Sequence, residues 1–174
     1  MPQGALYHHL FETPFGFAAV VFTGNRKAVR RILLPGQTRK AVEALISPYS
    51  AAAPSPPPPV RQLCRNIQAY FTARRIDFTR ELLDFGRLTE LEQQVLRAVS
   101  RVGYGRTKTY AAIAEQVGRS GAYRFVGTTL AKNPFPVVIP CHRIIRADGS
   151  PGGFGGGIDL KKRMLEMEKP LNPL

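Results

Sequence analysis

Cysteine and histidine are scarce in this sequence, with two Cys and three His among 174 residues. Cys64 and Cys141 could form one bridge at most, and so sparse a pair is better explained as two free thiols. No zinc-binding spacing links these cysteines to His8, His9 and His142. We therefore expect neither a structural disulfide nor a metal centre, and we place His8 and His9 on the surface of a strand.

Long apolar runs are also missing. The longest apolar run covers residues 17–22, whereas a membrane-spanning helix requires about 20 apolar residues. Residues 1–4 lack the basic start and apolar core of an export signal. The glycines of residues 152–157 lack dinucleotide-binding spacing, because Ile158 and Leu160 interrupt the pattern. We expect a soluble, cytoplasmic protein that binds no nucleotide cofactor and has no membrane partner.

Acidic residues are few, since 12 Asp and Glu stand against 25 Lys and Arg and leave a net charge of +13. Such a charge attracts a polyanion, either nucleic acid or an acidic membrane. The excess is greatest where only Glu115 opposes a series of cations: Arg97, Arg101, Arg106, Lys108, Arg119, Arg124, Lys132, Arg143 and Arg146. A solvated basic face usually interleaves acids, so this stretch favours a surface that follows phosphates.

The N-terminal part, residues 1–87, reads as a small α/β domain. Three short runs of aromatic and β-branched residues, separated by turn residues, predict an antiparallel sheet of strands at 7–11, 17–22 and 29–34. Residues 39–46 are compatible with a helix. The five prolines within residues 51–59 predict a stiff, exposed connector. Residues 60–72 return to helical spacing, and Cys64 adjoins the apolar stripe, which favours a core thiol over a reactive one.

The C-terminal part, residues 88–174, opens with capped helices. Thr89 and Glu92 have the spacing of a capping box, and an apolar stripe follows at helical spacing: Leu91, Val95, Leu96 and Val99. Thr109 is placed to cap a second helix with Ala111, Ala114 and Val117 inward, which Gly118 ends.

Ser120 is placed to cap a third helix over residues 121–132, which we expect to bury Ala122, Phe125, Val126 and Leu130. Two helices joined by a short turn that contains Gly118 match a helix-turn-helix, whose second helix enters a DNA groove. Helical hairpins are common, so this helix spacing alone is weak evidence for DNA binding, and the excess of basic residues is the stronger indication.

Cys141 lies between the apolar residues 135–140 and the cations His142 and Arg143. Neighbouring imidazole and guanidinium groups favour the thiolate, so we interpret Cys141 as a nucleophile rather than a buried structural thiol. His142 can assist it only if the backbone turns or a water bridges the two side chains, and Pro140 favours a turn.

A third group should orient the imidazole of His142. The nearest acids in sequence are Asp148, Asp159, Glu166 and Glu168. If residues 158–168 form a helix with Leu160, Met164, Leu165 and Met167 inward, Glu168 lies on or beside the buried face and Glu166 points outward. An ordinary helix-terminal acid remains the alternative for Glu168.

The segment from Asn133 to Arg143, with Arg124 on the preceding helix and a glycine-rich loop after it, resembles the O6-alkylguanine-DNA alkyltransferases, also called methylated-DNA–protein-cysteine methyltransferases. The resemblance runs from Thr89 to Glu168. It implies an N-terminal α/β domain of ribonuclease H-like topology and a mainly helical C-terminal domain with a helix-turn-helix of winged-helix-like type.

The resemblance also implies roles in catalysis. Cys141 is the alkyl acceptor, His142 deprotonates it through a water, and Glu168 orients His142. Asn133 braces the turn around the reactive segment. Tyr110 donates a hydrogen bond or proton to the departing guanine, which otherwise leaves as an anion.

For DNA, the resemblance implies entry from the minor groove, with Arg124 filling the space of a rotated nucleotide, because the O6 alkyl group is inaccessible in a stacked duplex. The expected DNA contacts are Arg124, Thr109, Tyr123, Thr128 and Lys132. The expected base pocket consists of Val138, Phe154, Gly155 and Gly156. Many relatives have Tyr-Ser-Gly-Gly where this chain has Phe154-Gly155-Gly156-Gly157.

The implied function is direct-reversal repair of O6-alkylguanine, and of O4-alkylthymine, in double-stranded DNA. This reaction needs no cofactor. We expect a monomer, with or without cooperative binding along DNA. We expect it in the cytoplasm, at the nucleoid of a prokaryote or in the nucleus of a eukaryote. The alternatives are a lesion-binding sensor without transfer chemistry, a cysteine hydrolase and a helix-turn-helix regulator.

Overall fold

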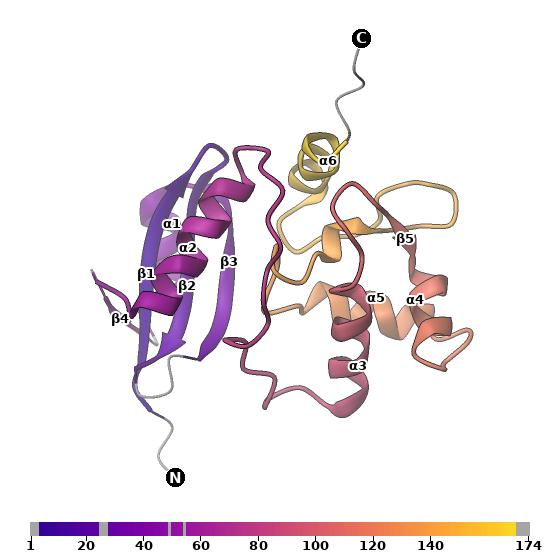
Figure 1. Ribbon diagram of the computed structural model, residues 1–174, viewed down its shortest axis with the longest axis horizontal. Coiled ribbons are helices and arrows are strands. Elements are labelled where there is room, and N and C mark those ends of the chain that lie inside the picture. Colours follow the sequence, from indigo (N-terminus) through magenta and orange to yellow (C-terminus); the bar gives the residue numbers. More distant parts are fainter. Residues whose placement is uncertain (1–3, 25–27, 49, 54, 170–174) are drawn as a thin grey trace. The chain divides into compact units, whose positions relative to one another are not determined.

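The computed structural model describes residues 4–24, 28–48, 50–53 and 55–169, and the chain divides into two compact units, Met1–Asp84 and Phe85–Leu174 (Figure 1). The first unit is a sheet with two helices and the second is mainly helical, as the sequence predicts. Among the helices of the described residues, none is long and apolar enough to cross a membrane.

The sheet of the first unit has the order β3-β2-β1-β4. Strands β1 (Leu6–Thr13) and β2 (Gly16–Thr23) form an antiparallel hairpin, and β3 (Val29–Gln37) is antiparallel to β2. The three predicted strands pair antiparallel as expected, but the sheet as a whole is mixed, because an additional short strand, β4 (Ala51–Ala52), pairs parallel with β1. A parallel neighbour requires a crossover, and α1 supplies it.

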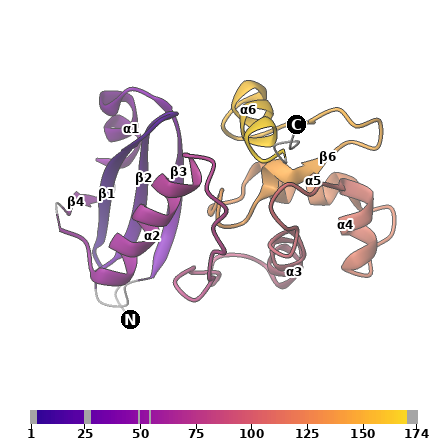
Figure 2. The same ribbon diagram turned by 45° about the horizontal axis from the view of Figure 1, so that its top comes forward.

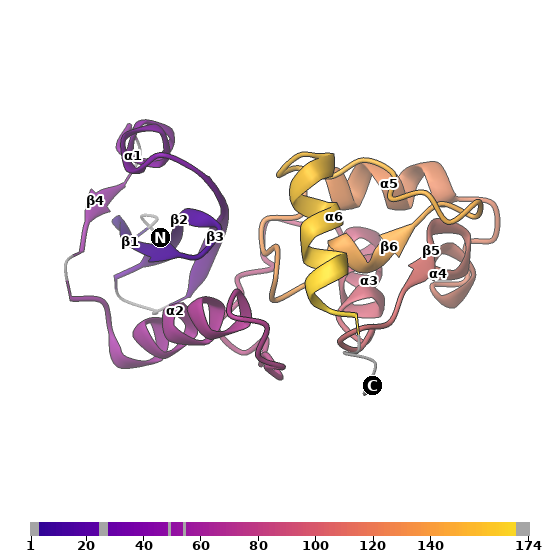
Figure 3. The ribbon, with the colours of Figure 1, turned by 90° about the horizontal axis from the view of Figure 1, so that it is seen from above.

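Helices α1 (Arg39–Ile46) and α2 (Pro58–Tyr70) cover opposite faces of this sheet (Figure 3). For this reason β2 is buried along both of its faces from Ala18 to Thr23. Val42 and Ile46 of α1 pack on one face, in a cluster with Ala19, Val21 and Leu33.

Helix α2 carries Cys64 on its buried side, where the thiol is 3% exposed and burial raises its pKa to about 12. Cys64 is therefore the core thiol that its place beside the apolar stripe predicts. With so high a pKa it stays protonated at neutral pH.

The predicted connector over residues 51–59 is only partly present. Ala51 and Ala52 belong to the sheet, Pro56 is buried, and Pro58 already lies in the first turn of α2. The first turn of a helix needs no backbone N–H donor, so proline fits there. His8 is another correction, because it is 7% exposed and its Nδ1 lies 2.9 Å from Ser50 Oγ.

The second unit begins with α3 (Glu90–Val99), whose capping box of Thr89 and Glu92 is formed as predicted. Strand β5 (Lys108–Thr109) runs directly into α4 (Tyr110–Gln116) and pairs parallel with β6 (Ile144–Ile145) (Figure 2). The remaining elements are α5 (Tyr123–Ala131), a 3₁₀ turn η1 (Cys141–Arg143) and α6 (Ile158–Met167). Thr109 caps α4 by accepting a hydrogen bond from the Ala112 N–H.

Two expectations for α5 are wrong. Ser120 does not cap the helix, because Gly118 and Gly121 both have positive φ and the turn extends to Ala122, which precedes the first helical residue. Phe125 is not in the core and is 36% exposed, and the buried side of α5 consists of Val126, Thr129 and Leu130. In α4, likewise, the inward residues are Ile113 and Ala114, and Ala111 is exposed.

Candidate active site

Cys141 opens the 3₁₀ turn η1 at the end of the apolar segment 135–140, which is buried throughout. Two backbone bonds fold this segment tightly, from the Ile139 N–H to the Phe135 carbonyl and from the Cys141 N–H to the Ile139 carbonyl, each 2.8 Å long. The backbone therefore turns at Cys141, as Pro140 predicts, and the Cys141 side chain is 5% exposed.

Asn133 braces this turn with both ends of its amide. Its Nδ2 donates to the Ile139 carbonyl at 3.0 Å and to the Cys141 Sγ at 3.0 Å, while its Oδ1 accepts from the Phe135 N–H at 3.0 Å. One side chain thus fixes the loop and also places a donor on the sulfur. A donor on sulfur favours the thiolate.

His142 is fully buried, and its Nε2 lies 2.8 Å from Glu168 Oε1. Burial lowers the pKa of His142, and the neighbouring Glu168 opposes that shift. The ring is therefore neutral at neutral pH. The hydrogen-bond network assigns its proton to Nε2, where it is donated to the carboxylate, so that Nδ1 carries the lone pair of a base.

Glu168 follows the last residue of α6 and is 2% exposed. Besides His142 it binds Arg143, whose Nε and Nη2 donate to its two oxygens at 2.8 and 2.9 Å, and the Gly105 N–H at 3.1 Å. The Arg143 Nη1 donates further to the Val102 carbonyl at 2.6 Å. A bidentate guanidinium and two N–H donors compensate the charge of a buried carboxylate.

The position of Gly105 permits this arrangement. Its φ is +69°, and a Cβ there would lie 2.8 Å from the Glu168 carbonyl oxygen. Of the four acids that the sequence left open, Glu168 is the one at His142. Asp148, Asp159 and Glu166 are exposed, and the Asp148 carboxylate accepts from the Ser150 N–H.

The expectation that His142 and Arg143 hold Cys141 as a thiolate is wrong. Burial raises the pKa of Cys141. His142 is neutral and the guanidinium of Arg143 binds Glu168, so neither supplies a positive charge that would favour the thiolate. The opposing influences come from the Asn133 amide and from the charge of Lys161.

Lys161 is a functional candidate that the sequence reasoning missed. It is fully buried in α6, and its Nζ donates to the Ile144 carbonyl at 2.5 Å and to the Gly153 carbonyl at 3.5 Å. The same Nζ lies 5.8 Å from the centre of the Tyr110 ring. Burial lowers the pKa of Lys161 to about 8, so it stays mainly protonated at neutral pH. Its spacing of three from Met164 was a signal that this lysine faces inward.

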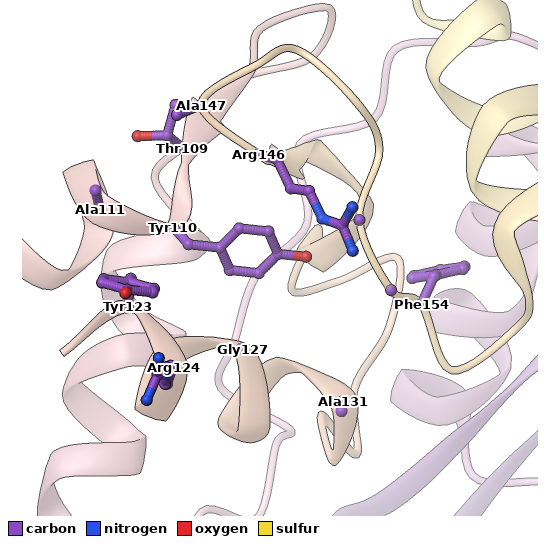
Figure 4. A pocket seen from close by; sticks show the side chains of 12 residues that line it. Thr109, Tyr110, Ala111, Tyr123, Arg124, Gly127, Ala131, Arg146, Ala147 and Phe154 are labelled. Atoms are coloured by element: carbon purple, nitrogen blue, oxygen red, sulfur yellow. The ribbon is translucent and has the colours of Figure 1, made fainter.

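A pocket of about 670 Å³ lies beside this cluster, with walls that are mostly small or aromatic. Its lining residues are Thr109, Tyr110, Ala111, Tyr123, Arg124, Gly127, Ala131, Arg146, Ala147, Gly152, Gly153 and Phe154. Figure 4 shows the Tyr110 ring extending across it, with the hydroxyl directed toward Arg146 and Phe154. Burial raises the pKa of Tyr110, and Cys141 adds to the shift. The phenol is therefore available as a proton donor.

One contact joins the pocket to the reactive cluster, and a second lies within the pocket wall. The Phe154 ring lies edge-on to the His142 ring, with centroids 6.4 Å apart. Gly152 touches the Tyr110 hydroxyl so closely that a Cβ at that glycine would lie 2.8 Å from it. The loop before α6 thus forms a wall of the pocket and also contacts the imidazole.

Of the predicted DNA and base contacts, Thr109, Tyr123, Arg124 and Phe154 line this pocket. The other predicted contacts do not line it. Val138 is buried three residues before Cys141, and the rest are exposed: Thr128, Lys132, Gly155 and Gly156. The Thr128 hydroxyl donates to the Arg124 carbonyl one turn earlier in α5. Within the described ranges, no cluster of three or more His, Cys, Asp or Glu is suited to a metal ion.

Known proteins resemble this chain in sequence, most of all over the unit that carries Cys141. Residues 90–170 match the family model described as the DNA-binding domain of 6-O-methylguanine DNA methyltransferase. The chain is 31% identical over 165 residues to the methylated-DNA–protein-cysteine methyltransferase of Methanosarcina barkeri, an alignment that covers 94% of this chain and 98% of that protein. The chain belongs to the methylated-DNA–protein-cysteine methyltransferase family.

Other relatives agree with this assignment. A family member from Methanothermobacter thermautotrophicus is 46% identical over 114 residues, an alignment that covers 66% of this chain and 64% of that protein. The aligned part is thus less than two thirds of that relative's length. Among solved structures, Mycobacterium tuberculosis OGT in complex with DNA superposes with a TM-score of 0.77 at 29% identity, covering 94% of this chain and 92% of that one. The Pyrococcus kodakaraensis O6-methylguanine-DNA methyltransferase gives a TM-score of 0.68 at 26% identity, covering 94% and 98%.

The contribution of Lys161 to the reactivity of Cys141 is testable. Lys161→Met keeps the length of the side chain and removes the charge that favours the thiolate, so we expect the pKa of Cys141 to rise further. The rate of alkylation by iodoacetamide, followed by peptide mass against pH, should then reach half of its maximum at a higher pH than in the parent. Cys64, with its pKa of about 12, stays unlabelled. Lys162→Met, on the exposed side of α6, is the control. Identical pH profiles for parent and Lys161→Met would contradict this role.

The coupling between Arg143 and Glu168 is testable by stability. Arg143→Met leaves a buried carboxylate without its guanidinium, which we expect to lower the free energy of unfolding by about 3 kcal/mol. The double variant Arg143→Met with Glu168→Gln should lose less than the sum of the two single variants, because the uncompensated charge is gone. Urea unfolding of the four proteins measures this cycle, and strictly additive losses would show that the two side chains are not coupled.

Proposed function

We propose that this protein repairs DNA directly, by moving the alkyl group from O6 of a guanine to the sulfur of Cys141. One observation carries the proposal: Cys141, bonded to Asn133, and His142, bonded to Glu168, are adjacent residues of one buried turn beside a pocket walled by Tyr110. Family membership supports it, since the relatives are named for methyl transfer from DNA to a protein cysteine.

His142 acts as the base in this proposal. Its Nε2 proton is held by Glu168, so Nδ1 receives the thiol proton of Cys141 through a water, and the carboxylate stabilises the imidazolium that forms. Because burial keeps the thiol protonated at rest, the nucleophile forms only when the base removes its proton. Asn133 then donates to the sulfur as negative charge develops there.

The transfer itself is a single displacement at carbon. The sulfur of Cys141 forms a bond to the alkyl carbon as the bond from that carbon to guanine O6 breaks, and the electron pair of the broken bond stays on guanine. The Tyr110 hydroxyl gives guanine a proton, and the proton taken from Cys141 replaces it, so the products are a thioether and neutral guanine. A thioether is stable in water, and each molecule therefore acts once.

DNA recognition in this proposal uses α4 and α5 as a helix-turn-helix of winged-helix-like type that approaches the minor groove. Arg124 fills the space of the flipped nucleotide, which a base-modifying reaction at O6 requires. Thr109, Tyr123, Thr128 and Lys132 contact the strand around it. The flipped base is held by backbone groups of Val138 and of the loop formed by Phe154, Gly155 and Gly156.

The proposal extends to the fold of the first unit, the substrates, the oligomeric state and the place of action, each as the resemblance implies. The first unit has ribonuclease H-like topology, and the substrates are O6-alkylguanine and O4-alkylthymine in double-stranded DNA. The protein acts as a monomer, with or without cooperative binding along DNA, in the cytoplasm and at the nucleoid of a prokaryote or in the nucleus of a eukaryote. A lesion sensor without transfer chemistry is the rival, and the presence of Cys141 next to the His142 base favours transfer.

The proposal is tested with a duplex oligonucleotide that carries O6-methylguanine. After incubation, the peptide containing Cys141 should gain the mass of one methyl group, with at most one lesion repaired per protein molecule. Cys141→Ala should bind the same duplex without any gain in mass. An unmodified Cys141 peptide with the lesion still bound would show a sensor, and repair of many lesions per molecule would contradict a single transfer.

A further inference from the structure

Arg146 is a charged residue of the pocket to which the proposed reaction gives no role. It follows β6 directly and begins a tight turn, in which its N–H donates to the Ser150 carbonyl at 2.9 Å and its carbonyl accepts from the Gly149 N–H at 3.0 Å. The register of β5 and β6 pairs Thr109 with Ile145, which places Arg146 beside Tyr110. The backbone of Arg146 is therefore held in place next to the candidate proton donor.

The side chain of Arg146 points into the pocket. Figure 4 shows its guanidinium directed inward, on the side of the Tyr110 hydroxyl and of Phe154. Arg124 lines the same pocket from α5, and the lining residues include two arginines and no acid. The nearest acid of its own turn, Asp148, is exposed and accepts from the Ser150 N–H. The pocket thus combines small and aromatic walls with positive charge, which suits an aromatic ring attached to an anion.

The position of Arg146 favours a phosphate rather than the reacting base. The cation that acts on the Cys141 thiol is Lys161, which is fully buried, whereas Arg146 is exposed to solvent and its charge acts on Tyr110 and Lys161. Arg146 therefore lies further outward than the sulfur. A guanidinium presents parallel N–H donors that match phosphate oxygens.

We propose that Arg146 binds a backbone phosphate next to the flipped nucleotide. Rotation of the nucleotide into the pocket then carries its phosphate onto a cation fixed by the turn of residues 146–150, which favours the flipped state over the stacked one. The inference rests on the proposed function in one respect, namely that a nucleotide of DNA enters this pocket.

The test measures DNA binding separately from alkyl transfer. Binding of a fluorescent duplex with O6-methylguanine is followed by anisotropy at rising salt, in a Cys141→Ala background that blocks transfer. Arg146→Gln should weaken binding and lower the slope of log Kd against log salt by about 1, the loss of one phosphate contact. Arg146→Lys should keep most of the slope, because it keeps the charge. Lys162→Gln removes an exposed cation of α6 that does not line the pocket and lies outside the basic stretch of residues 97–146, and it serves as the control for net charge.

A second readout separates phosphate from base. With Cys141 restored, Arg146→Gln should slow transfer from the duplex by a larger factor than transfer from free O6-benzylguanine, which has no phosphate. Equal factors on both substrates, or a salt slope no different from that of Lys162→Gln, would overturn the proposal. If the parent transfers no alkyl group but the slope still changes, the proposed reaction fails and the phosphate contact stands.

Discussion

The buried carboxylate of Glu168 is the group on which the rest of the candidate site depends. It joins three segments that are distant in sequence, because it binds His142 and Arg143 of η1 from the end of α6 and also accepts from the Gly105 N–H. A charge at 2% exposure is tolerated only with such partners. The same contacts that compensate this charge also orient the His142 ring, so the stability of the second unit and the chemistry of its base have one origin.

Around that carboxylate, the electrostatics favour a thiol that is inactive at rest. Burial raises the pKa of Cys141, and Asn133 and Lys161 act against that effect without the help of Arg143. A buried, protonated thiol resists adventitious alkylation and oxidation, which matters for a residue that is used once. Reactivity then depends on the neutral imidazole of His142 and on a substrate held in the adjoining pocket.

Local signals in the sequence predicted much of this structure. Runs of aromatic and β-branched residues between turns predicted the three main strands, and the capping box of Thr89 predicted the start of α3. Helical spacing placed Glu168 on or beside the inward side of α6. Ser120 was misjudged as a cap because two glycines with positive φ extend the turn. The pairing of Arg143 with Glu168 and the bond from Lys161 to the Ile144 carbonyl are tertiary contacts across 25 and 17 residues, which adjacency in sequence does not reveal. The pKa of Cys141 was misjudged for the same reason.

The role of His142 as the base depends on which of its ring nitrogens carries a proton. Nitrogen-15 NMR of the imidazole, recorded against pH on the intact protein, distinguishes the two neutral tautomers and the imidazolium. Glu168 at 2.8 Å from Nε2 and the lowered pKa of the ring predict a neutral imidazole at neutral pH, with its proton on Nε2 and the lone pair on Nδ1. A proton on Nδ1, or an imidazolium at pH 7, would contradict the assignment of His142 as the base.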